Sequence, residues 1–518
     1  MLAVLKSGSL LGIKGIIISV EVDLSRGIPA FDIVGLPDTA VRESRERVKS
    51  AIKNSGYDFP VKRITINLAP ANIKKMGPHF DLAIACGILA AQGLIDSDQI
   101  KDYLFIGELS LNGDLRKVKG VLPMILAASK NKLKGVIIPS QNEAEAKLVC
   151  GIKIIPINHI SELIKYFGIN NKYNSKKELI SDKTLTAKND LKSSEFKNYK
   201  IDFSDIKGQY EAKRALEIAV AGGHNLIMIG PPGVGKTMMA KRIPTIMPPL
   251  LKTEQLELSR IQSIMGELDL DNGLQTKRPF RKPHHSITKA SMIGGGKIPT
   301  PGEISLAHKG VLFLDEISEY RREVLELLRQ PLEEKNITIS RATMTVDFPC
   351  DFILIASSNP CPCGYYGDSR RECHCTVNQI ARYRNKISGP LLDRIDIQLE
   401  VPSLSVEEMT IYQKGESSAE IRKRVIAAHK KQINRYSNDD FKQNSQLNGE
   451  FLNKYCKINT KNRLLLKKAV NELGLSARGY DRILRVARTI SDLADSDAIK
   501  TDHLAEAIQY RRLEKNII

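Results

Sequence analysis

One stretch of the chain, Gly230–Thr237, has the residue types and spacing of a phosphate-binding loop, or P-loop. It fits the pattern G-x-x-x-x-G-K-[ST] and comprises Gly230, Pro231, Pro232, Gly233, Val234, Gly235, Lys236 and Thr237. Glycines let main-chain N–H groups close around phosphate oxygens, and the N-terminus of a following helix adds positive partial charge. We expect Lys236 to reach the β- and γ-phosphates of ATP and the Thr237 hydroxyl to ligate Mg²⁺. The alternative is an ordinary glycine-rich turn before a helix.

Two carboxylates follow a second apolar run. Asp315 and Glu316 come directly after Val311–Leu314, which is typical of a buried strand. Beside a P-loop, Asp315 is expected to hold Mg²⁺, directly or through water, and Glu316 to orient and deprotonate the attacking water. Asn359 ends a third apolar run and is expected to hydrogen-bond the γ-phosphate or that water. The alternatives are strand termination at the surface for the two acids and a turn before Pro360 for the asparagine.

A further catalytic candidate stands at the start of a predicted helix. Ser476 can cap this helix, which carries an apolar stripe, and Arg478 falls in its first turn. A cation in the first turn opposes the helix dipole unless an anion compensates. A phosphate would supply that anion, so we expect Arg478 to contact nucleotide; a solvated surface arginine is the alternative.

Four of the eight cysteines form two C-x-C pairs just after Asn359. Nine residues separate Cys361 and Cys363 from Cys373 and Cys375. Four thiolates can build a tetrahedral structural zinc (Zn²⁺) site that pins a loop with little core of its own. The one-residue spacing within each pair is tighter than the commoner spacing of about two to four residues. Four reduced cysteines or a redox-responsive patch are the alternatives.

The three apolar runs with polar ends indicate strands of a parallel sheet that is covered on both faces. They are Asn225–Gly230, Val311–Glu316 and Phe352–Asn359. Ligands gather beyond the carboxyl ends of such strands, which places the polar residues in one site. The sequence therefore predicts an α/β P-loop ATPase core over residues 201–400. Helical patterns dominate from about Val401, which predicts an all-α domain over 401–518.

The first part of the chain predicts a separate mixed α/β domain, residues 1–168. β-like runs such as Gly15–Val22 and Gly135–Pro139 alternate there with helical stretches such as Thr39–Asn54. Residues 169–200 turn polar and lysine-rich, and are expected to form a flexible linker.

Composition narrows the setting of the protein. Lysine and arginine outnumber aspartate and glutamate by 78 to 59, a net charge of +19. Such an excess is expected where a protein meets a polyanion, although many basic proteins bind no nucleic acid. No apolar run reaches the roughly 18 residues that cross a bilayer, and no signal peptide is recognisable, so we expect a soluble, cytoplasmic protein. Eight cysteines are too few for a disulfide scaffold.

These motifs, together with three longer strings, resemble the ComM/YifB family of magnesium-chelatase-like AAA+ proteins over essentially the whole chain. The strings are Arg281–Ser286, Pro301–Glu316 and Gly389–Asp396. The resemblance implies an AAA+ core with a C-terminal helical lid, in which Asn359 is the residue called sensor 1. It also implies that Arg394 is an arginine finger that reaches into a neighbouring subunit's ATP. Hydrolysis would then require a ring, which we expect to be a hexamer.

The same resemblance implies loops that face DNA. Residues 289–300 and 336–346 look like the helix-2 insert and the pre-sensor hairpin of helicase-like AAA+ motors, which line the ring channel. Their basic residues are candidate phosphate contacts, with simple solvation as the alternative: Lys289, Lys297, Lys335 and Arg341. For Arg394, the alternative is a surface arginine paired with Asp393 or Asp396.

The first domain resembles the proteolytic domain of Lon, most closely in Phe105–Leu115 and Gly135–Asn142. The resemblance implies a Ser–Lys dyad at two positions that here hold His79 and Leu122. Such a dyad needs a hydroxyl nucleophile and an amine base. We therefore expect a Lon-like fold without peptidase activity.

The leading interpretation is a hexameric, ATP-hydrolysing DNA motor. The family resemblance implies a helicase-like role in branch migration, during recombination of incoming DNA in natural transformation. The alternatives are a chelatase-like motor that remodels a partner protein and an ATP-dependent protease.

Overall fold

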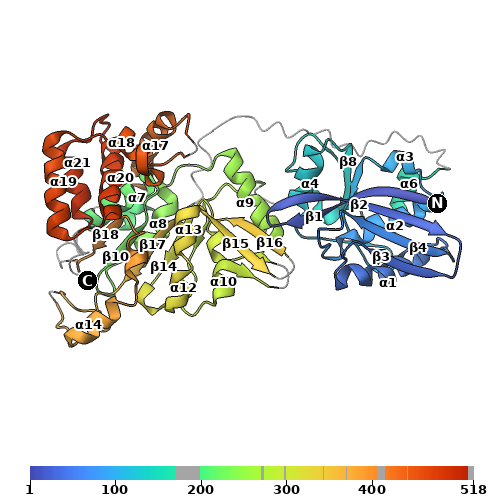
Figure 1. Ribbon diagram of the computed structural model, residues 1–518, viewed down its shortest axis with the longest axis horizontal. Helices are drawn as coiled ribbons and strands as arrows, with labels where there is room; N and C mark the ends of the chain where they lie inside the picture. The colour runs from blue at the N-terminus through green and yellow to red at the C-terminus, as the bar shows by residue number, and fades with distance from the viewer. Residues whose placement is uncertain are drawn as a thin grey trace.

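Two β-sheets organise the computed structural model, which describes residues 1–169, 199–269, 273–296, 299–341, 344–368, 370–404, 415–439 and 441–511. In Figure 1 the N-terminal sheet (blue) lies at one end of the long axis and the C-terminal helices (red) at the other, with the second sheet between them. The predicted linker falls almost wholly outside the described residues. The predicted α/β class, with a parallel sheet and a helical C-terminal region, is confirmed.

The N-terminal sheet has seven strands in the order β3-β4-β2-β1-β5-β8-β9. The strands are β1 (Leu2–Leu11), β2 (Lys14–Ser25), β3 (Ala30–Val34), β4 (Arg63–Ala69), β5 (Tyr103–Phe105), β8 (Gly135–Pro139) and β9 (Lys153–Ile157). β1, β2 and β4 pair antiparallel, whereas β5, β8 and β9 run parallel. Gly12, at φ +61°, makes the tight turn between β1 and β2, where glycine adopts the left-handed conformation at little cost.

Helices cover both faces of this sheet. They are α1 (Thr39–Asn54), α2 (Asp81–Ala91), α3 (Ser97–Ile100), α4 (Val121–Lys130), α5 (Glu143–Ala146) and α6 (Ser161–Phe167). Phe105 packs into the cluster that contains α1 and α2, whereas its neighbour Leu104 packs into the cluster that contains α4. Because side chains alternate along a strand, α2 and α4 lie on opposite faces. The residues of α2 are buried throughout, as expected of a helix that is apolar on all sides.

The second sheet has five strands in the order β11-β14-β17-β10-β18, all parallel. They are β10 (Leu226–Ile229), β11 (Phe280–Arg281), β14 (Val311–Leu314), β17 (Ile353–Ser358) and β18 (Ile397–Glu400). Val311 and Phe313 face one hydrophobic cluster, and Leu312 and Leu314 face another. Burial on both faces explains the continuous apolar runs of the sequence. Because β10, β14 and β17 run parallel, their carboxyl ends lie at one edge of the sheet.

Helices and short connections surround this sheet. They are α7 (Tyr210–Gly222), α8 (Lys236–Ile246), α9 (Lys252–Met265), α10 (Lys289–Ile293), α11 (Glu303–Leu306), α12 (Arg322–Glu326), α13 (Arg329–Glu334), α14 (Val377–Arg384) and α15 (Gly389–Leu392). A two-residue pair, β12 (Gly294–Gly295) with β13 (Thr300–Pro301), follows α10. β15 (Asn336–Arg341) and β16 (Met344–Pro349) form an antiparallel hairpin, so the predicted pre-sensor hairpin is a hairpin in the structure.

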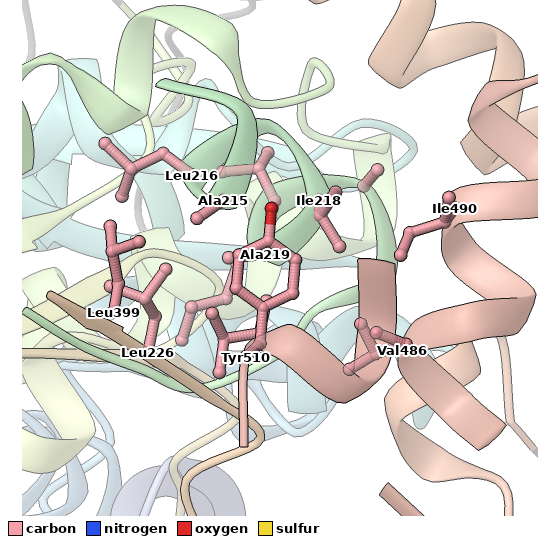
Figure 2. Packing of buried hydrophobic residues seen from close by; sticks show 14 of the residues in the cluster. Ala215, Leu216, Ile218, Ala219, Leu226, Leu399, Val486, Ile490 and Tyr510 are labelled. Atoms are coloured by element: carbon pink, nitrogen blue, oxygen red, sulfur yellow. The ribbon is translucent and has the colours of Figure 1, made fainter. Parts of the chain in front are cut away.

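The C-terminal helices pack against the second sheet through α7. They are α17 (Ser418–Arg435), α18 (Gly449–Tyr455), α19 (Thr460–Leu473), α20 (Ala477–Leu493) and α21 (Thr501–Gln509). Figure 2 shows α7 side chains between the two layers, with Leu226 and Leu399 of the strands on one side and Val486 and Ile490 of α20 on the other. One continuous core therefore joins the helical region to the ATPase sheet. None of the helices in the described ranges is long and apolar enough to cross a membrane.

The N-terminal domain contacts the ATPase core through α4 and α9. The main-chain N–H of Gly120 donates to the Ser263 carbonyl at 2.9 Å, and the Ser263 hydroxyl donates to Glu145 at 2.5 Å. Glu145 is buried and also accepts from the N–H of Leu122 at 3.0 Å. Polar contacts thus fix the joint between the two parts.

Candidate nucleotide site and metal centre

The P-loop connects β10 to α8, as the motif requires. Gly233 and Gly235 have φ values of +84° and +91°, a region that residues with a Cβ rarely adopt. At Gly230 a Cβ would lie 2.2 Å from the Val401 carbonyl oxygen, so the loop passes too close to the neighbouring chain for a side chain. These three glycines shape a loop that begins directly at the carboxyl end of the strand.

Lys236, at the first position of α8, points back into the loop. Its ammonium donates to the Gly230 carbonyl, to the Pro231 carbonyl at 2.9 Å and to Asn359 Oδ1 at 3.1 Å. Burial lowers the pKa of Lys236 to about 8, although the carboxylates of Asp315 and Glu316 oppose that change. The structure therefore brings the predicted phosphate lysine and the predicted sensor asparagine into direct contact.

Asp315 lies at the carboxyl end of β14 and gathers three donors. Thr237 Oγ1 donates to its Oδ2 at 2.9 Å, and Ser357 Oγ donates to its Oδ1 at 2.6 Å. Lys282 Nζ contacts Oδ2 at 2.7 Å. Burial favours the neutral acid, but the hydrogen bonds from these three residues outweigh it and hold the pKa of Asp315 below its usual range. The carboxylate is thus charged and oriented beside the Thr237 hydroxyl.

Glu316 has an unusual backbone conformation and an exposed side chain. Its φ is +52°, in the left-handed region that costs a residue with a Cβ on the order of 1–3 kcal/mol. Its N–H donates to Ser357 Oγ at 3.1 Å, so the same serine holds both acids of the pair. Glu316 is therefore exposed at the edge of the site, next to Asp315.

This arrangement fits ATP with Mg²⁺. We call Lys236, Thr237, Asp315, Glu316 and Asn359 the P-loop edge. Mg²⁺ prefers oxygen ligands, and the Thr237 hydroxyl and the Asp315 carboxylate already meet at hydrogen-bonding distance. Lys236 supplies a cation beside the loop N–H groups. A triphosphate and its metal ion are therefore matched in charge and in ligand type.

Sequence reasoning missed Ser357 and Lys282. Ser357 is a small polar residue within a strand that reads as apolar, and nothing in the order of the sequence pairs it with Asp315. Lys282 belongs to the string Arg281–Ser286, which was singled out only for its resemblance to a family. Its lysine lies next to β11, the strand beside β14, and this adjacency becomes visible only in the assembled sheet.

Arg394 does not lie at the P-loop edge of its own chain. It follows α15 and pairs with Glu333 of α13 at 2.5 Å, and its Nη1 donates to the Pro390 carbonyl at 2.7 Å. The ion-pair partner is thus Glu333, whereas Asp396 pairs with Arg482 instead. Only 8% of the Arg394 side chain is exposed.

Arg394 and Arg478 line one cavity of about 420 Å³, which we call the arginine pocket. Its lining includes Arg394, Glu333, Asn225, Arg478, Arg482 and Arg485, and none of the five residues of the P-loop edge. Arg478 lies exposed in the first turn of α20, whose cap is formed by Ser476 Oγ accepting from the Gly479 N–H at 3.2 Å. The structure therefore groups the two predicted catalytic arginines with each other and apart from Lys236.

The four predicted zinc ligands form a cluster in which all sulfur atoms lie within 4.8 Å of one another. Cys361 Sγ lies 3.3 Å from Cys363 and 3.6 Å from Cys373. These separations resemble the roughly 3.8 Å edge of a tetrahedron with Zn–S bonds of about 2.3 Å, and exceed the roughly 2.05 Å of a disulfide. The Tyr365 N–H and the Cys361 thiol lower the pKa of Cys363 to about 6, whereas burial and the neighbouring thiols raise the pKa of Cys373 to about 12. The cluster therefore suits a soft cation such as Zn²⁺.

The cysteine loop also touches the P-loop. Gly364 lies between the cysteine pairs at φ +88°, and a Cβ there would approach Pro232 Cδ to 2.8 Å. The loop that the four cysteines gather is therefore part of the wall of the nucleotide site.

The predicted DNA contacts lie in different environments. Lys289 pairs with Glu323 at 2.5 Å, and Lys335 pairs with Asp351. Arg341 is exposed at the tip of the β15–β16 hairpin. Lys297 lies outside the described residues. Arg341 is thus the candidate with no ion pair among those that the structure describes.

The positions that match Lon's dyad are both buried. His79 is 8% exposed and burial lowers its pKa to about 4, and Leu122 is the second residue of α4 and has no exposed surface. Neither side chain offers a hydroxyl nucleophile or an amine base.

Comparison with known proteins places these features in a family. Models of magnesium chelatase, subunit ChlI, match residues 202–409 and 20–142, and the C-terminal model of that subunit matches residues 415–511. Competence protein ComM of Haemophilus influenzae is 43% identical over 516 residues, covering 99% of this chain and 98% of that protein. Protein YifB of Salmonella typhimurium is 41% identical over 521 residues, covering 100% and 98%.

A second likeness is confined to part of the chain. Lon protease 2 of Bacillus subtilis is 29% identical over 185 residues, which cover 31% of this chain and 33% of that protease. Membership of the magnesium chelatase group of AAA+ proteins suggests ATPase activity, with ATP and Mg²⁺ at the P-loop edge. With more than 40% identity over its full length to ComM and YifB, the chain belongs to the ComM/YifB family of magnesium-chelatase-like AAA+ proteins.

Proposed function

We propose that this protein is an ATP-hydrolysing motor that works in the cytoplasm as a homohexameric ring on branched DNA, where it promotes branch migration during natural transformation. The observation that carries the proposal is the separation of the P-loop edge from the arginine pocket, since each is half of a hydrolysis site. The name of the relative competence protein ComM supports the link to DNA uptake. The net charge of +19 supports contact with a polyanion.

Each residue of the P-loop edge has a role in this proposal. Lys236 binds the β- and γ-phosphates, and Thr237 and Asp315 hold Mg²⁺, which when bound neutralises negative charge on the phosphates. Glu316 accepts a proton from the attacking water, and Asn359 orients that water or the γ-phosphate. Ser357 and Lys282 keep Asp315 ionised and in place.

The arginines are proposed to act on the nucleotide of the neighbouring subunit. Strands rise about 3.3 Å per residue, so the five steps along β10 from Asn225 to Gly230 span about 16 Å. The P-loop leaves one end, and Asn225, which lines the arginine pocket, precedes the other. A nucleotide on the chain's own P-loop is therefore too far for Arg394, whereas a ring brings the pocket of one subunit to the P-loop edge of the next. The phosphate charge would then replace Glu333 as the partner of Arg394.

The function can be tested by measuring ATPase rate and strand-exchange progress with no DNA, single-stranded DNA, duplex DNA and a four-way junction. We expect the four-way junction to stimulate hydrolysis most. The protein should also convert the junction into duplex products by strand exchange, and only when ATP is present. The Lys236→Ala variant is the inactive control. Stimulation by a partner protein, with no response to any of the DNA substrates, would instead favour a chelatase-like remodelling motor.

The trans arrangement can be tested by mixing subunits. A Lys236→Ala subunit lacks a working P-loop edge but carries Arg394, and an Arg394→Ala subunit has the reverse defect. Mixed rings, confirmed by co-purification of differently tagged subunits, should recover ATPase activity that neither parent has. Confirmed mixed rings without recovery, or full activity in a monomer, would contradict the proposal.

We also propose that Cys361, Cys363, Cys373 and Cys375 hold one structural Zn²⁺. Two observations support this site: the four sulfur atoms lie within 4.8 Å of one another, and the loop that carries them contacts Pro232 of the P-loop. The metal would fix the loop against the nucleotide site, while the chemistry of hydrolysis stays with Mg²⁺ and the P-loop edge.

A further inference from the structure

Asn225 connects the P-loop strand to the main chain of Arg394. Its side-chain Nδ2 donates to the Arg394 carbonyl at 3.0 Å, and its Oδ1 accepts from the Leu354 N–H at 2.9 Å. Its own carbonyl accepts from the N–H groups of Asp396 and Ile397, each at 3.0 Å. Asn225 therefore bonds with both its side chain and its main chain, and it stands directly before β10, next to β17 and beside the turn that carries Arg394.

The other side of the turn is fixed by Asp396. This buried carboxylate contacts His224 Nδ1 and Arg482 Nε, each at 3.2 Å. His224 Nε2 in turn contacts the Thr489 hydroxyl of α20 at 2.7 Å. The Asn225 N–H also donates to Asp396 Oδ2 at 3.4 Å, so Asp396 ties the turn to the helix that bears Arg478 and shares with Asn225 the tie to the strand that leads to the P-loop.

We propose that Asn225 is a positioning residue that sets the direction in which Arg394 leaves the backbone toward the neighbouring subunit's nucleotide. The inference rests on the proposed trans role of Arg394. Asn225 touches no reacting group, since it acts on the Arg394 carbonyl. Without its amide the carbonyl loses its donor and the turn can shift. A displacement of about 1 Å at a catalytic group can cost about 10²-fold in rate.

The mixing assay separates this role from a general structural one. In the first experiment Asn225→Ala is added to the Lys236→Ala subunit, which is the donor because it supplies Arg394. In the second experiment it is added to the Arg394→Ala subunit, which is the recipient because its P-loop edge uses the donor's arginine. We expect the altered donor to lose about 10-fold to 100-fold of the recovered activity. The altered recipient should stay within about twofold of its parent, because its Arg394 is already absent. Equal loss in both roles, or no loss in the donor, would overturn the inference.

Two further variants serve as a control and as a substitute in this assay. Asn54→Ala is the matched control, because Asn54 Nδ2 also donates to a distant carbonyl, that of Leu111 at 2.8 Å, in the N-terminal domain. It should leave recovery unchanged in the donor. Asn225→Ser is the substitute if Asn225→Ala subunits do not enter rings, because its hydroxyl is too short to bridge to the Arg394 carbonyl and should give the same donor-specific loss.

The failure of the proposed function would look different. If donors with native Asn225 give no recovery in confirmed mixed rings, the trans role of Arg394 and the inference both fall. If native and altered donors recover equally well, the trans role stands and only the inference about Asn225 is wrong.

Discussion

The P-loop edge and the arginine pocket differ in how complete they are within one chain. At the P-loop edge, Lys236 already contacts Asn359 at 3.1 Å, and Thr237 contacts Asp315 at 2.9 Å. In the arginine pocket, Arg394 is paired with Glu333, and Arg478 is exposed among lining residues that include none of the P-loop edge. The first region is preorganised for a ligand, and the second is organised around an ion pair that a ligand would have to replace.

This difference indicates which region determines ATP affinity and which determines the rate of hydrolysis. Interactions formed equally with bound substrate and with the transition state give affinity, whereas those gained only in the transition state give rate. We therefore expect substitutions at the P-loop edge that remove phosphate contacts to abolish binding, and substitutions in the arginine pocket to spare binding and reduce turnover.

The largest effect is expected from Lys236→Ala. This change removes the buried ammonium beside Gly230 and Pro231, so the phosphates lose their main cation, and ATP binding and hydrolysis should both fall below detection. Fluorescent-nucleotide titration and ATPase assays would check it. Tight ATP binding by a folded Lys236→Ala protein would break the assignment of affinity to the P-loop edge.

The next effect is expected from Arg394→Ala. ATP should bind nearly as in the native protein, while the maximal rate in the ring falls by about 10³-fold to 10⁵-fold, the range known for arginine fingers. Nucleotide titration compared with steady-state ATPase rate separates the two quantities. An equal loss of affinity and rate would mean that this arginine serves ground-state binding, and would remove the contrast between the two regions.

Glu316→Gln should come third. The amide keeps the size of the side chain but cannot take a proton, so we expect retained ATP binding and a loss of about 10²-fold to 10⁴-fold in hydrolysis. Single-turnover hydrolysis of prebound ATP would measure the chemical step itself. Near-native single-turnover rates would show that another group activates the water.

A smaller effect on the nucleotide site is expected from Cys363→Ser. Metal analysis of the native protein should find about one zinc per chain, and the variant should hold less, because one of four thiolates is lost. Since the cysteine loop leans on Pro232, ATP affinity should fall only a few-fold. Cys150→Ser is the control, because Cys150 is an exposed thiol outside the cluster. Well-folded native protein that contains no metal would show that the four cysteines do not hold a structural zinc.

The sequence predicted those parts of the site that depend on local order. Gly233, Gly235 and Lys236 lie in one loop whose motif specifies its shape, and Asp315 and Asn359 each follow or end an apolar run whose length and composition favour a buried strand. Their convergence follows from parallel strands sharing one edge. The helix that carries Arg478 was predicted with its cap, because Ser476 and the apolar stripe are signals within a few residues.

Contacts between distant segments could not be predicted in this way. Glu333 lies far from Arg394 in the sequence, whereas Asp393 and Asp396 are close to it and were the partners that the sequence suggested. Which acid meets the arginine depends on how α13 packs beside α15, and that is decided by the whole core. Ser357 and Asn225 were missed for the same reason. The predicted domain limits stay predictions.

The left-handed backbone of Glu316 carries a trade-off between stability and activity. A glycine would relieve its positive φ, so Glu316→Gly should raise the free energy of unfolding of the ATPase core by about 1 kcal/mol relative to Glu316→Gln. Because the ATPase sheet shares one core with the C-terminal helices, the unit that unfolds is large, and the rise in the unfolding midpoint should be about 2 °C, which calorimetry can measure. Both variants lose the same carboxylate and should be equally inactive, so any difference in midpoint reports the backbone alone. The protein holds a less stable turn because the residue that would relax it cannot accept a proton.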